Sequence, residues 1–291
     1  MTPPPKPPRE HDLGLEYDLR ALHRRRFLGL FAGAGLAAVA GCSPDDATDS
    51  TGTTTSRSPT SSTSTSSTPS AGTPTASTTT GSTDVDEIPQ ETGGPYPGDG
   101  SNGPNVLTES GIVRSDLTKS FGSASGTATG VPLSVELTIL DADKDSPLAG
   151  AAVYLWHCDA QGRYSLYSDG VTNENYLRGV QAADSSGKVT FTTIFPAAYM
   201  GRWPHIHFEV YASLDDATAA GKITRTSQLA LPKDVCDTVY ATDGYDGSAQ
   251  NLSQTSLERD NVFGDDGGVH QLATVTGDVS NGYVAVLGVG V

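Results

Sequence analysis

Residues 199–211, YMGRWPHIHFEVY, combine two histidines with an arginine and a tyrosine in a segment otherwise typical of a β-strand. Alternate side chains of a strand share a face, so His205 and His207 point the same way while Ile206 points to the opposite face, toward the core. Their Cα atoms would then be about 7 Å apart, which lets both imidazoles reach one metal ion. A His-x-His pair alone is weak support for a metal site, because exposed strands carry such pairs by chance.

The elements that must position these histidines are strands. Residues 131–139 alternate between apolar and polar types, which is the period-2 pattern of a half-buried strand. Further strands are predicted at residues 152–158, 187–194, 205–213, 226–231 and 282–291. Helix signals are weak apart from a short helix at residues 255–263. We therefore predict an all-β fold, an antiparallel β-sandwich with long loops and little helix.

The N-terminal region, residues 1–42, has the pattern of an export signal. A basic start at residues 24–26 precedes an apolar run over residues 27–40, which is too short for a bilayer span of about 20 residues. The Arg-Arg-x-Phe-Leu pattern resembles a twin-arginine signal, and VAGC, ending at Cys42, resembles the lipobox of bacterial lipoproteins. We predict an exported protein, either a cell-surface lipoprotein that meets the membrane only through a lipid on Cys42, or a secreted protein.

A tether is predicted between this signal and the folded domain. Of the 41 positions in residues 43–83, 27 are Ser or Thr, which leaves too little apolar surface to offset the entropy cost of ordering the chain. We predict a disordered Ser/Thr-rich tether over residues 43–87. Residues 88–291, about 200 in number, have the usual size of one domain.

The charge balance of the folded part excludes one class of partner. From Glu91 onward the chain carries 24 Asp and Glu residues against 11 Lys and Arg residues, with no basic block. Nucleic acid binding requires a positive surface, so we predict no nucleic acid partner.

Two cysteines, Cys158 and Cys236, remain when Cys42 is assigned to a lipid. In an oxidising compartment such a pair is expected to form a disulfide. Two free thiols, or two soft metal ligands, are the alternatives.

Other residues with suitable chemistry accompany the histidines. Tyr199 lies six residues before His205, Arg202 lies three before it, and Tyr164 follows a glycine turn in WHCDAQGRYSLYSD. With GRY, FPAAY and RWPHIHF in this order, residues 94–291 resemble the intradiol ring-cleavage dioxygenases, the non-haem ferric enzymes that include catechol and protocatechuate dioxygenases. The sequence is most similar to a branch of exported, single-domain members. The stretch TGGPYPGDGSNGPNVL also resembles the entry segment of that branch.

The resemblance implies one Fe(III) ion. By motif position its ligands would be Tyr164, Tyr199, His205 and His207. Phenolate oxygens suit a hard trivalent ion, and coordination removes the phenol proton because the ion is the largest local charge.

The resemblance also implies a reaction and three catalytic residues. A catechol-type aromatic diol reacts with O2, the ring opens between the two hydroxylated carbons, and a cis,cis-muconate-type diacid results. Arg202 would stabilise negative charge on the substrate. Tyr199 would leave the metal and take up a proton, and Gln228 would lie near the ligands.

Departures from the family leave some properties open. Trp203 and Pro204 follow Arg202, where the well-known enzymes show Pro-Ala, and the segment before His205 is shorter. The substrate and the oligomeric state therefore stay undetermined. Tyr167, three residues past Tyr164, is an alternative first tyrosine ligand.

Some residues that could be mistaken for ligands are predicted to be structural. His157 is interpreted as a hydrogen-bonding histidine. The run of Asp141, Asp143 and Asp145 lacks the glycine and distal glutamate of an EF-hand and is predicted to be a solvated turn.

Three other functions would fit the same fold. The chain could be a surface-tethered ligand-binding sandwich, a zinc or copper site that uses only His205 and His207, or an iron-binding member without turnover.

Overall fold

The computed structural model describes residues 85–291. The predicted export segment with Cys42, and all but the last residues of the predicted tether, lie outside the described residues. Within the described part, no helix is both long and apolar enough to cross a bilayer.

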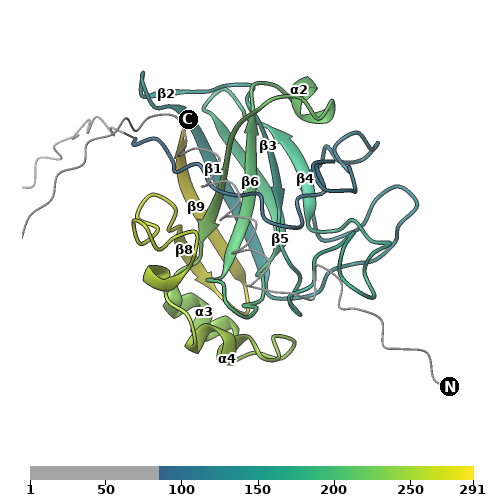
Figure 1. Cartoon of the computed structure of the whole chain (residues 1–291), viewed down its shortest axis with the longest axis vertical. Coiled ribbons are helices and arrows are strands. Elements are labelled where there is room, and N and C mark those ends of the chain that lie inside the picture. The colour runs from purple at the N-terminus through teal and green to yellow at the C-terminus, as the bar shows by residue number, and fades with distance from the viewer. Residues whose placement is uncertain (1–84) are drawn as a thin grey trace, which may run out of the picture. The chain divides into compact units, whose positions relative to one another are not determined.

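Two β-sheets form the described domain (Figure 1). One has the order β2-β1-β9-β8 with β5 also paired to β1, and the other has the order β4-β3-β6-β7. The strands of the first sheet are β1 (Pro132–Asp141), β2 (Ser146–Pro147), β5 (Lys188–Ile194), β8 (Thr274–Asp278) and β9 (Gly282–Gly290). Those of the second are β3 (Ala152–Trp156), β4 (Arg178–Ala182), β6 (His205–Tyr211) and β7 (Ile223–Ala230).

The prediction of an all-β sandwich is confirmed, with one exception in strand direction. Most pairs are antiparallel, but β1 and β9 pair in parallel from Leu133–Tyr283 to Leu140–Gly290. Strands that pair in parallel can lie far apart in the sequence, as β1 and β9 do. The local residue pattern of each strand therefore does not reveal the direction of pairing.

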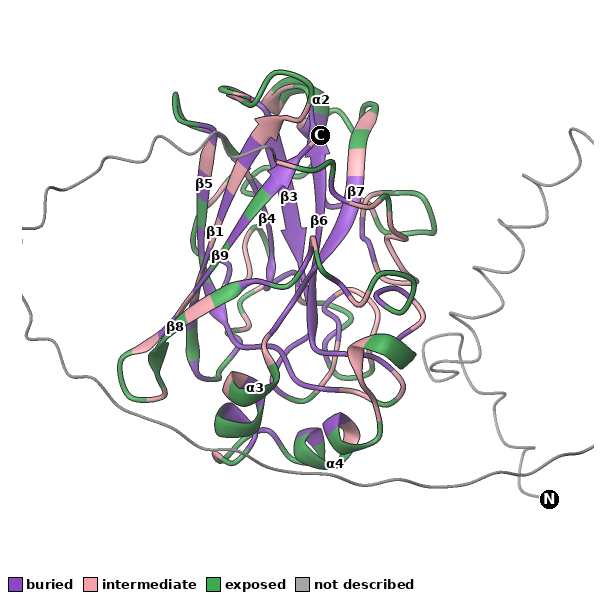
Figure 2. Ribbon diagram, turned by 90° about the vertical axis from the view of Figure 1, so that its left-hand side faces the viewer, coloured by how far each residue is buried: buried purple, intermediate pink, exposed green. Residues whose placement is uncertain are grey.

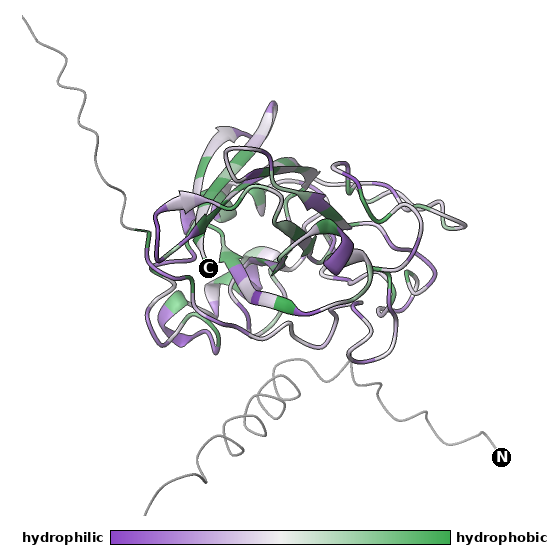
Figure 3. Ribbon diagram, turned by 90° about the horizontal axis from the view of Figure 1, so that it is seen from above, coloured by the Kyte–Doolittle hydropathy of each residue, from purple (hydrophilic) through white to green (hydrophobic). Residues whose placement is uncertain are grey.

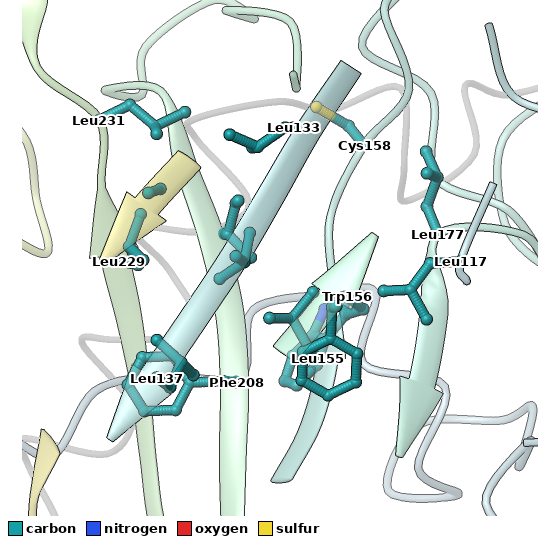
Figure 4. Packing of buried hydrophobic residues seen from close by; sticks show 14 of the residues in the cluster. Leu117, Leu133, Leu137, Leu155, Trp156, Cys158, Leu177, Phe208, Leu229 and Leu231 are labelled. Atoms are coloured by element: carbon teal, nitrogen blue, oxygen red, sulfur yellow. The ribbon is translucent and has the colours of Figure 1, made fainter. Parts of the chain in front are cut away.

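The hydrophobic core lies between the sheets. Residues at the predicted apolar positions of β1 are buried, with Val135, Leu137 and Ile139 fully inaccessible. They belong to one cluster with Phe208 of β6 and Leu229 of β7, and Figure 4 shows Leu137, Phe208 and Leu229 among the residues of that cluster. In the view from above, the hydrophobic residues gather on the strands and the hydrophilic residues on the outer loops (Figure 3).

Strand β6 is buried on both faces, as is its neighbour β3. All seven of its residues are buried, whereas β8 is mostly exposed (Figure 2). The face that carries Ile206, Phe208 and Val210 meets the core, as predicted. The histidine face is covered by loops rather than by solvent, so polar groups there must find partners inside the protein.

The helices are short and lie at the ends of the sandwich (Figure 1). They are α2 (Leu214–Thr218), α3 (Lys233–Val239), α4 (Ser248–Ser253) and the 3-10 turn η2 (Leu257–Arg259). Only η2 falls in the predicted helix at residues 255–263, and it is shorter than predicted, because the backbone becomes extended at Asp260. The turn after Asp141 is confirmed, since its carboxylate accepts the N–H groups of Asp143 and Lys144.

The domain begins earlier than the predicted boundary at residue 88. Glu87 forms a parallel bridge with Gly290 and an ion pair with Arg225. The Ile88 N–H donates to the Gly290 carbonyl at 2.9 Å. Residues 85–87 therefore belong to the folded domain rather than to the tether.

The predicted disulfide is wrong, because Cys158 and Cys236 are free, buried thiols. The Cys158 thiol donates to the Ala197 carbonyl at 3.6 Å. Cys236 lies on α3 and contacts the hydroxyl of Tyr240. Burial raises the pKa of both thiols well above its ordinary value. They therefore stay protonated and unreactive at neutral pH.

His157 is a structural residue, as the sequence predicted. Its Nδ1 lies 2.8 Å from the Cys158 carbonyl, and its Nε2 lies 2.7 Å from the hydroxyl of Thr193 on β5. The imidazole thus joins the end of β3 in one sheet to β5 in the other. Burial lowers the pKa of His157 to about 4.

This lowered pKa predicts a pH-dependent stability. The unfolded chain binds a proton below about pH 6.5 and the folded chain only below about pH 4, so folding stability falls as the pH drops between these values. The His157 contribution to that loss is about 3 kcal/mol. Urea unfolding of the wild type and of His157→Gln at several pH values measures it, because groups common to both proteins cancel.

We expect His157→Gln to lose part of the wild-type pH slope, because this change removes the buried imidazole. Equal slopes for His157→Gln and the wild type would contradict the burial argument.

Candidate metal centre

Four polar atoms meet on the loop-covered face of β6. The Tyr164 Oη lies 3.3 Å from the His207 Nε2 and 3.4 Å from the Tyr199 Oη. The Tyr199 Oη lies 3.2 Å from the His205 Nε2, and the two histidine Nε2 atoms are 3.1 Å apart. These four atoms form a closed ring, which we call the donor cluster.

The pleat and register of β6 place the two histidines. His207 lies opposite Trp156 of β3, and the two rings stack with centroids 4.9 Å apart and planes 6° apart. The His205 Nδ1 lies 2.6 Å from the Trp203 carbonyl. This bond places the proton of His205 on Nδ1 and leaves its Nε2 lone pair for the cluster.

The loop after β3 places Tyr164. Asp159, which is buried, accepts the N–H groups of Gln161 and Arg163 and the hydroxyl of Tyr176. The Tyr164 N–H donates to the Ser168 hydroxyl at 2.9 Å. This turn is fixed by Asp159 in much the same way as an Asx-turn, and it directs the Tyr164 ring toward β6.

The loop before β6 places Tyr199. Residues of α4 hold the preceding Ala198, whose N–H donates to the Ser248 hydroxyl and whose carbonyl accepts the Asn251 amide. Gly201 then adopts a positive φ of 85°, which favours glycine and turns the chain into β6. Tyr164 is buried whereas Tyr199 is partly exposed, so the two phenols differ in solvent access.

Burial sets the charge of the cluster. It raises the pKa of Tyr164 well above its ordinary value, helped by the neighbouring Tyr199. Burial also lowers the pKa values of His205 and His207 well below 6.5. The Arg202 charge lowers the pKa of His205 further. For His207, the next contributions come from His205 and then from Arg202. Tyr164 and both imidazoles are therefore neutral at pH 7 unless a cation lies among them.

Comparison with known proteins shows that this chain is similar to dioxygenases. A family model described as "Dioxygenase" matches residues 102–242. A solved intradiol ring-cleavage dioxygenase from Tetranychus urticae superposes with a TM-score of 0.57 at 24% identity, over 70% of this chain and 94% of that one. The described domain thus has the fold of an intradiol ring-cleavage dioxygenase, and most of its residues match the dioxygenase family model.

A curated relative gives a shorter match to this chain. A chlorocatechol 1,2-dioxygenase from Pseudomonas sp. (strain P51) is 34% identical over 86 residues, which cover 23% of this chain and 34% of the relative. The match thus spans about a third of that relative's length.

Tyr167 lies outside the donor cluster. Its hydroxyl donates to the Asn102 side chain and accepts the Gly98 N–H, both at 2.8 Å. Of the two tyrosines between which the sequence left a choice, Tyr164 is the one that joins Tyr199, His205 and His207.

Arg202 lies beside the cluster and is held by a residue that sequence reasoning missed. Its Nη1 lies 3.5 Å from the His205 Nε2, and its Nε donates to the Asp260 carboxylate at 3.0 Å. Asp260 is fully buried and also accepts the N–H groups of Trp203, Val262 and Phe263. No sequence signal marked Asp260, which was placed inside a predicted helix 58 residues from its partner.

Gln228 joins Arg202 to the N-terminal part of the domain. Its Oε1 accepts the Arg202 Nη2 at 2.7 Å, and its Nε2 donates to the Thr92 carbonyl at 2.9 Å. Gln228 thus contacts Arg202, which lies beside the cluster, and its contacts make it a positioning residue for Arg202.

The donor cluster fits a hard metal ion. Ligand atoms about 2 Å from a common ion lie about 3 Å or slightly more from one another, which matches the observed ring. Its donors are two phenol oxygens and two imidazole nitrogens, and buried phenols lose their protons only beside a cation. In the described part of the chain, no three or more His, Cys, Asp or Glu side chains are arranged to hold a metal, so the tyrosines are needed for this one.

The buried Arg202–Asp260 pair predicts a large effect of Asp260→Asn. The change removes the anion that compensates a guanidinium that is itself buried, so we expect a loss of about 3–5 kcal/mol in the free energy of unfolding. Asp237→Asn removes the acid of the exposed Lys233 pair and should change it by less than about 0.5 kcal/mol. Urea titration of both variants decides this, and equal effects would contradict the assignment.

Proposed function

We propose that this dioxygenase cleaves catechol-type aromatics with O2, by means of a non-haem Fe(III) ion held by Tyr164, Tyr199, His205 and His207. The product would be a cis,cis-muconate-type diacid that contains both atoms of O2. The observation that carries this proposal is the convergence of two phenol oxygens and two imidazole nitrogens in a buried cluster. When bound, the ferric ion would draw electron density from the diol and make its ring susceptible to O2.

Tyr199 is the residue that we expect to move a proton. Tyr199 is partly exposed and lies on a loop whose next residue, Met200, is 71% exposed. Tyr164, in contrast, is buried on a turn fixed by Asp159. An incoming diol must lose its protons to chelate a cation, and the Tyr199 phenolate is the base best placed to receive one.

Arg202 would stabilise the negative charge that the reaction builds on the substrate. Its guanidinium is fixed by Asp260 and Gln228 and directs Nη1 toward the cluster. A prepositioned cation in a water-poor site stabilises such charge without the cost of reorganisation. Gln228 keeps this cation in place.

The partners that we propose are a small aromatic diol and O2, with no nucleic acid. We also propose that the protein is exported, either secreted or tethered at the cell surface through a lipid on Cys42. The support for this location is the sequence pattern of residues 1–42.

The two competing tyrosines give the sharpest test of the proposal. Tyr164→Phe removes a cluster oxygen, so we expect less bound iron, loss of the visible tyrosinate-to-iron band and turnover lower by at least roughly 100-fold. Tyr167→Phe, which removes a hydroxyl outside the cluster, should retain iron and colour. Metal analysis, visible absorption and O2 uptake with catechol measure these effects.

The same measurements separate the alternatives. A colourless native protein without iron that gains no band from added ferric salt would sink the proposal and favour a ligand-binding module. Zinc or copper in place of iron would favour a different metal site. Iron and colour without O2 uptake across several catechols would indicate a member without turnover.

A further inference from the structure

A segment near the N-terminal end of the domain crosses the donor face of β6. We call residues 92–98 the strap. A Cβ added at Gly94 would lie 3.3 Å from the His207 Cε1, and one at Gly93 would lie 3.8 Å from the Glu209 Oε1. The Tyr96 ring packs on the Tyr164 ring with centroids 4.7 Å apart. The strap therefore touches His207 and Tyr164, which belong to different elements.

Side chains from the two outer strands of one sheet hold the strap at its ends. Gln228 of β7 donates to the Thr92 carbonyl at 2.9 Å. At the other end, Arg178 of β4 donates to the Tyr96 carbonyl at 2.9 Å and to the Pro97 carbonyl at 2.8 Å. Since β4 and β7 are the edges of the sheet β4-β3-β6-β7, the strap spans the sheet that carries the histidines.

Arg178 also holds the turn that carries Tyr164. Its Nε donates to the Ser165 hydroxyl at 3.0 Å, and its Nη2 donates to the Ser165 carbonyl at 3.0 Å. The next residue, Leu166, has a φ of 71°, a conformation that costs a leucine about 1 kcal/mol or more. The bonds to Ser165 come just before this strained position and hold the chain there.

The buried guanidinium of Arg178 couples its bonds to the strap with its bonds to Ser165. The side chain is 1% exposed, and none of the ion pairs in residues 85–291 involves it. With the contact to the Tyr154 hydroxyl at 3.1 Å, its five N–H donors have five oxygen partners. A buried guanidinium without an anion is costly unless every donor is satisfied. Loss of either the strap or the Tyr164 turn would leave donors unsatisfied, so each supports the other.

We propose that Arg178 is a positioning residue of the ring-cleavage site. It locks the Tyr164 turn and the strap together and so holds the Tyr96 ring on the Tyr164 ring as a fixed wall of the donor cluster. Its effect on iron and substrate rests on the proposed function, whereas its coupling of the strap to the turn does not.

The matched experiment compares Arg178→Lys with Arg114→Lys. Arg114 also donates to backbone carbonyls, among them the Arg178 carbonyl at 2.9 Å and the Asn175 carbonyl at 3.1 Å, but it contacts neither the strap nor Ser165. It therefore controls for damage to β4. A lysine has three donors on one nitrogen and cannot reach the five acceptors of Arg178.

The first readout is amide hydrogen exchange in metal-free protein. Arg178→Lys should speed exchange in residues 92–98 and in residues 164–168 by at least about tenfold. Arg114→Lys should leave both segments as in the wild type. If Arg178→Lys leaves either segment unchanged, or if Arg114→Lys speeds both equally, the proposal is overturned.

Ser165→Ala keeps the proposal testable if Arg178→Lys does not fold. This change removes the Ser165 hydroxyl, which accepts the Arg178 Nε and donates to the Tyr176 carbonyl, and it leaves the Gly98–Tyr167 bond and the Tyr96–Tyr164 ring contact in place. We expect exchange in residues 92–98 to rise about fivefold. An unchanged strap in this variant would also overturn the proposal.

The second readout uses iron-loaded protein. Arg178→Lys should shift the visible band and raise KM for catechol more than it lowers kcat, because Tyr164 and the pocket wall move while Arg202 stays. Arg114→Lys should change none of these, and a matching band and KM in the two variants would contradict a positioning role. A wild type that binds no iron would defeat the proposed function but leave the exchange test intact.

Discussion

The structure depends on one constraint, which is that two phenol oxygens and two imidazole nitrogens meet within 3.4 Å of their neighbours in a buried space. No single element can supply such a set, because a strand presents only alternate residues to one face. β6 provides both histidines, and two separate loops provide the tyrosines. Much of the remaining loop structure serves to hold those two loops against β6.

The two faces of β6 have different roles, one in the stability of the fold and the other in the candidate metal centre. The face of β6 that carries Phe208 packs into the hydrophobic core between the sheets, while the opposite face carries the donor cluster. A strand anchored by its apolar face cannot slip in register without moving its apolar residues out of the core. The positions of His205 and His207 are therefore fixed by the same packing that stabilises the fold.

Two buried arginines flank the cluster and are compensated in different ways. Arg202 has the Asp260 carboxylate, whereas Arg178 has carbonyl and hydroxyl oxygens. Both charges help to lower the pKa of His207. A site with positive potential and neutral imidazoles suits anionic oxygen ligands, such as phenolates or a deprotonated diol. This agreement between electrostatics and donor type supports the proposed chemistry independently of the family.

The sequence by itself determined the elements whose information is local. The alternation in β1 and β6 predicted both strands and their core-facing residues, and the resemblance carried by GRY, FPAAY and RWPHIHF implied the members of the donor cluster. Only the tertiary structure decided between Tyr164 and Tyr167, left Cys158 and Cys236 as free thiols, and paired β1 in parallel with β9. It also brought Asp260 to Arg202, and Gln228 to Thr92 across 136 residues of chain. The physical reason is that strand periodicity is a property of neighbouring residues, whereas hydrogen bonds to buried groups depend on which distant segments the packed core brings together.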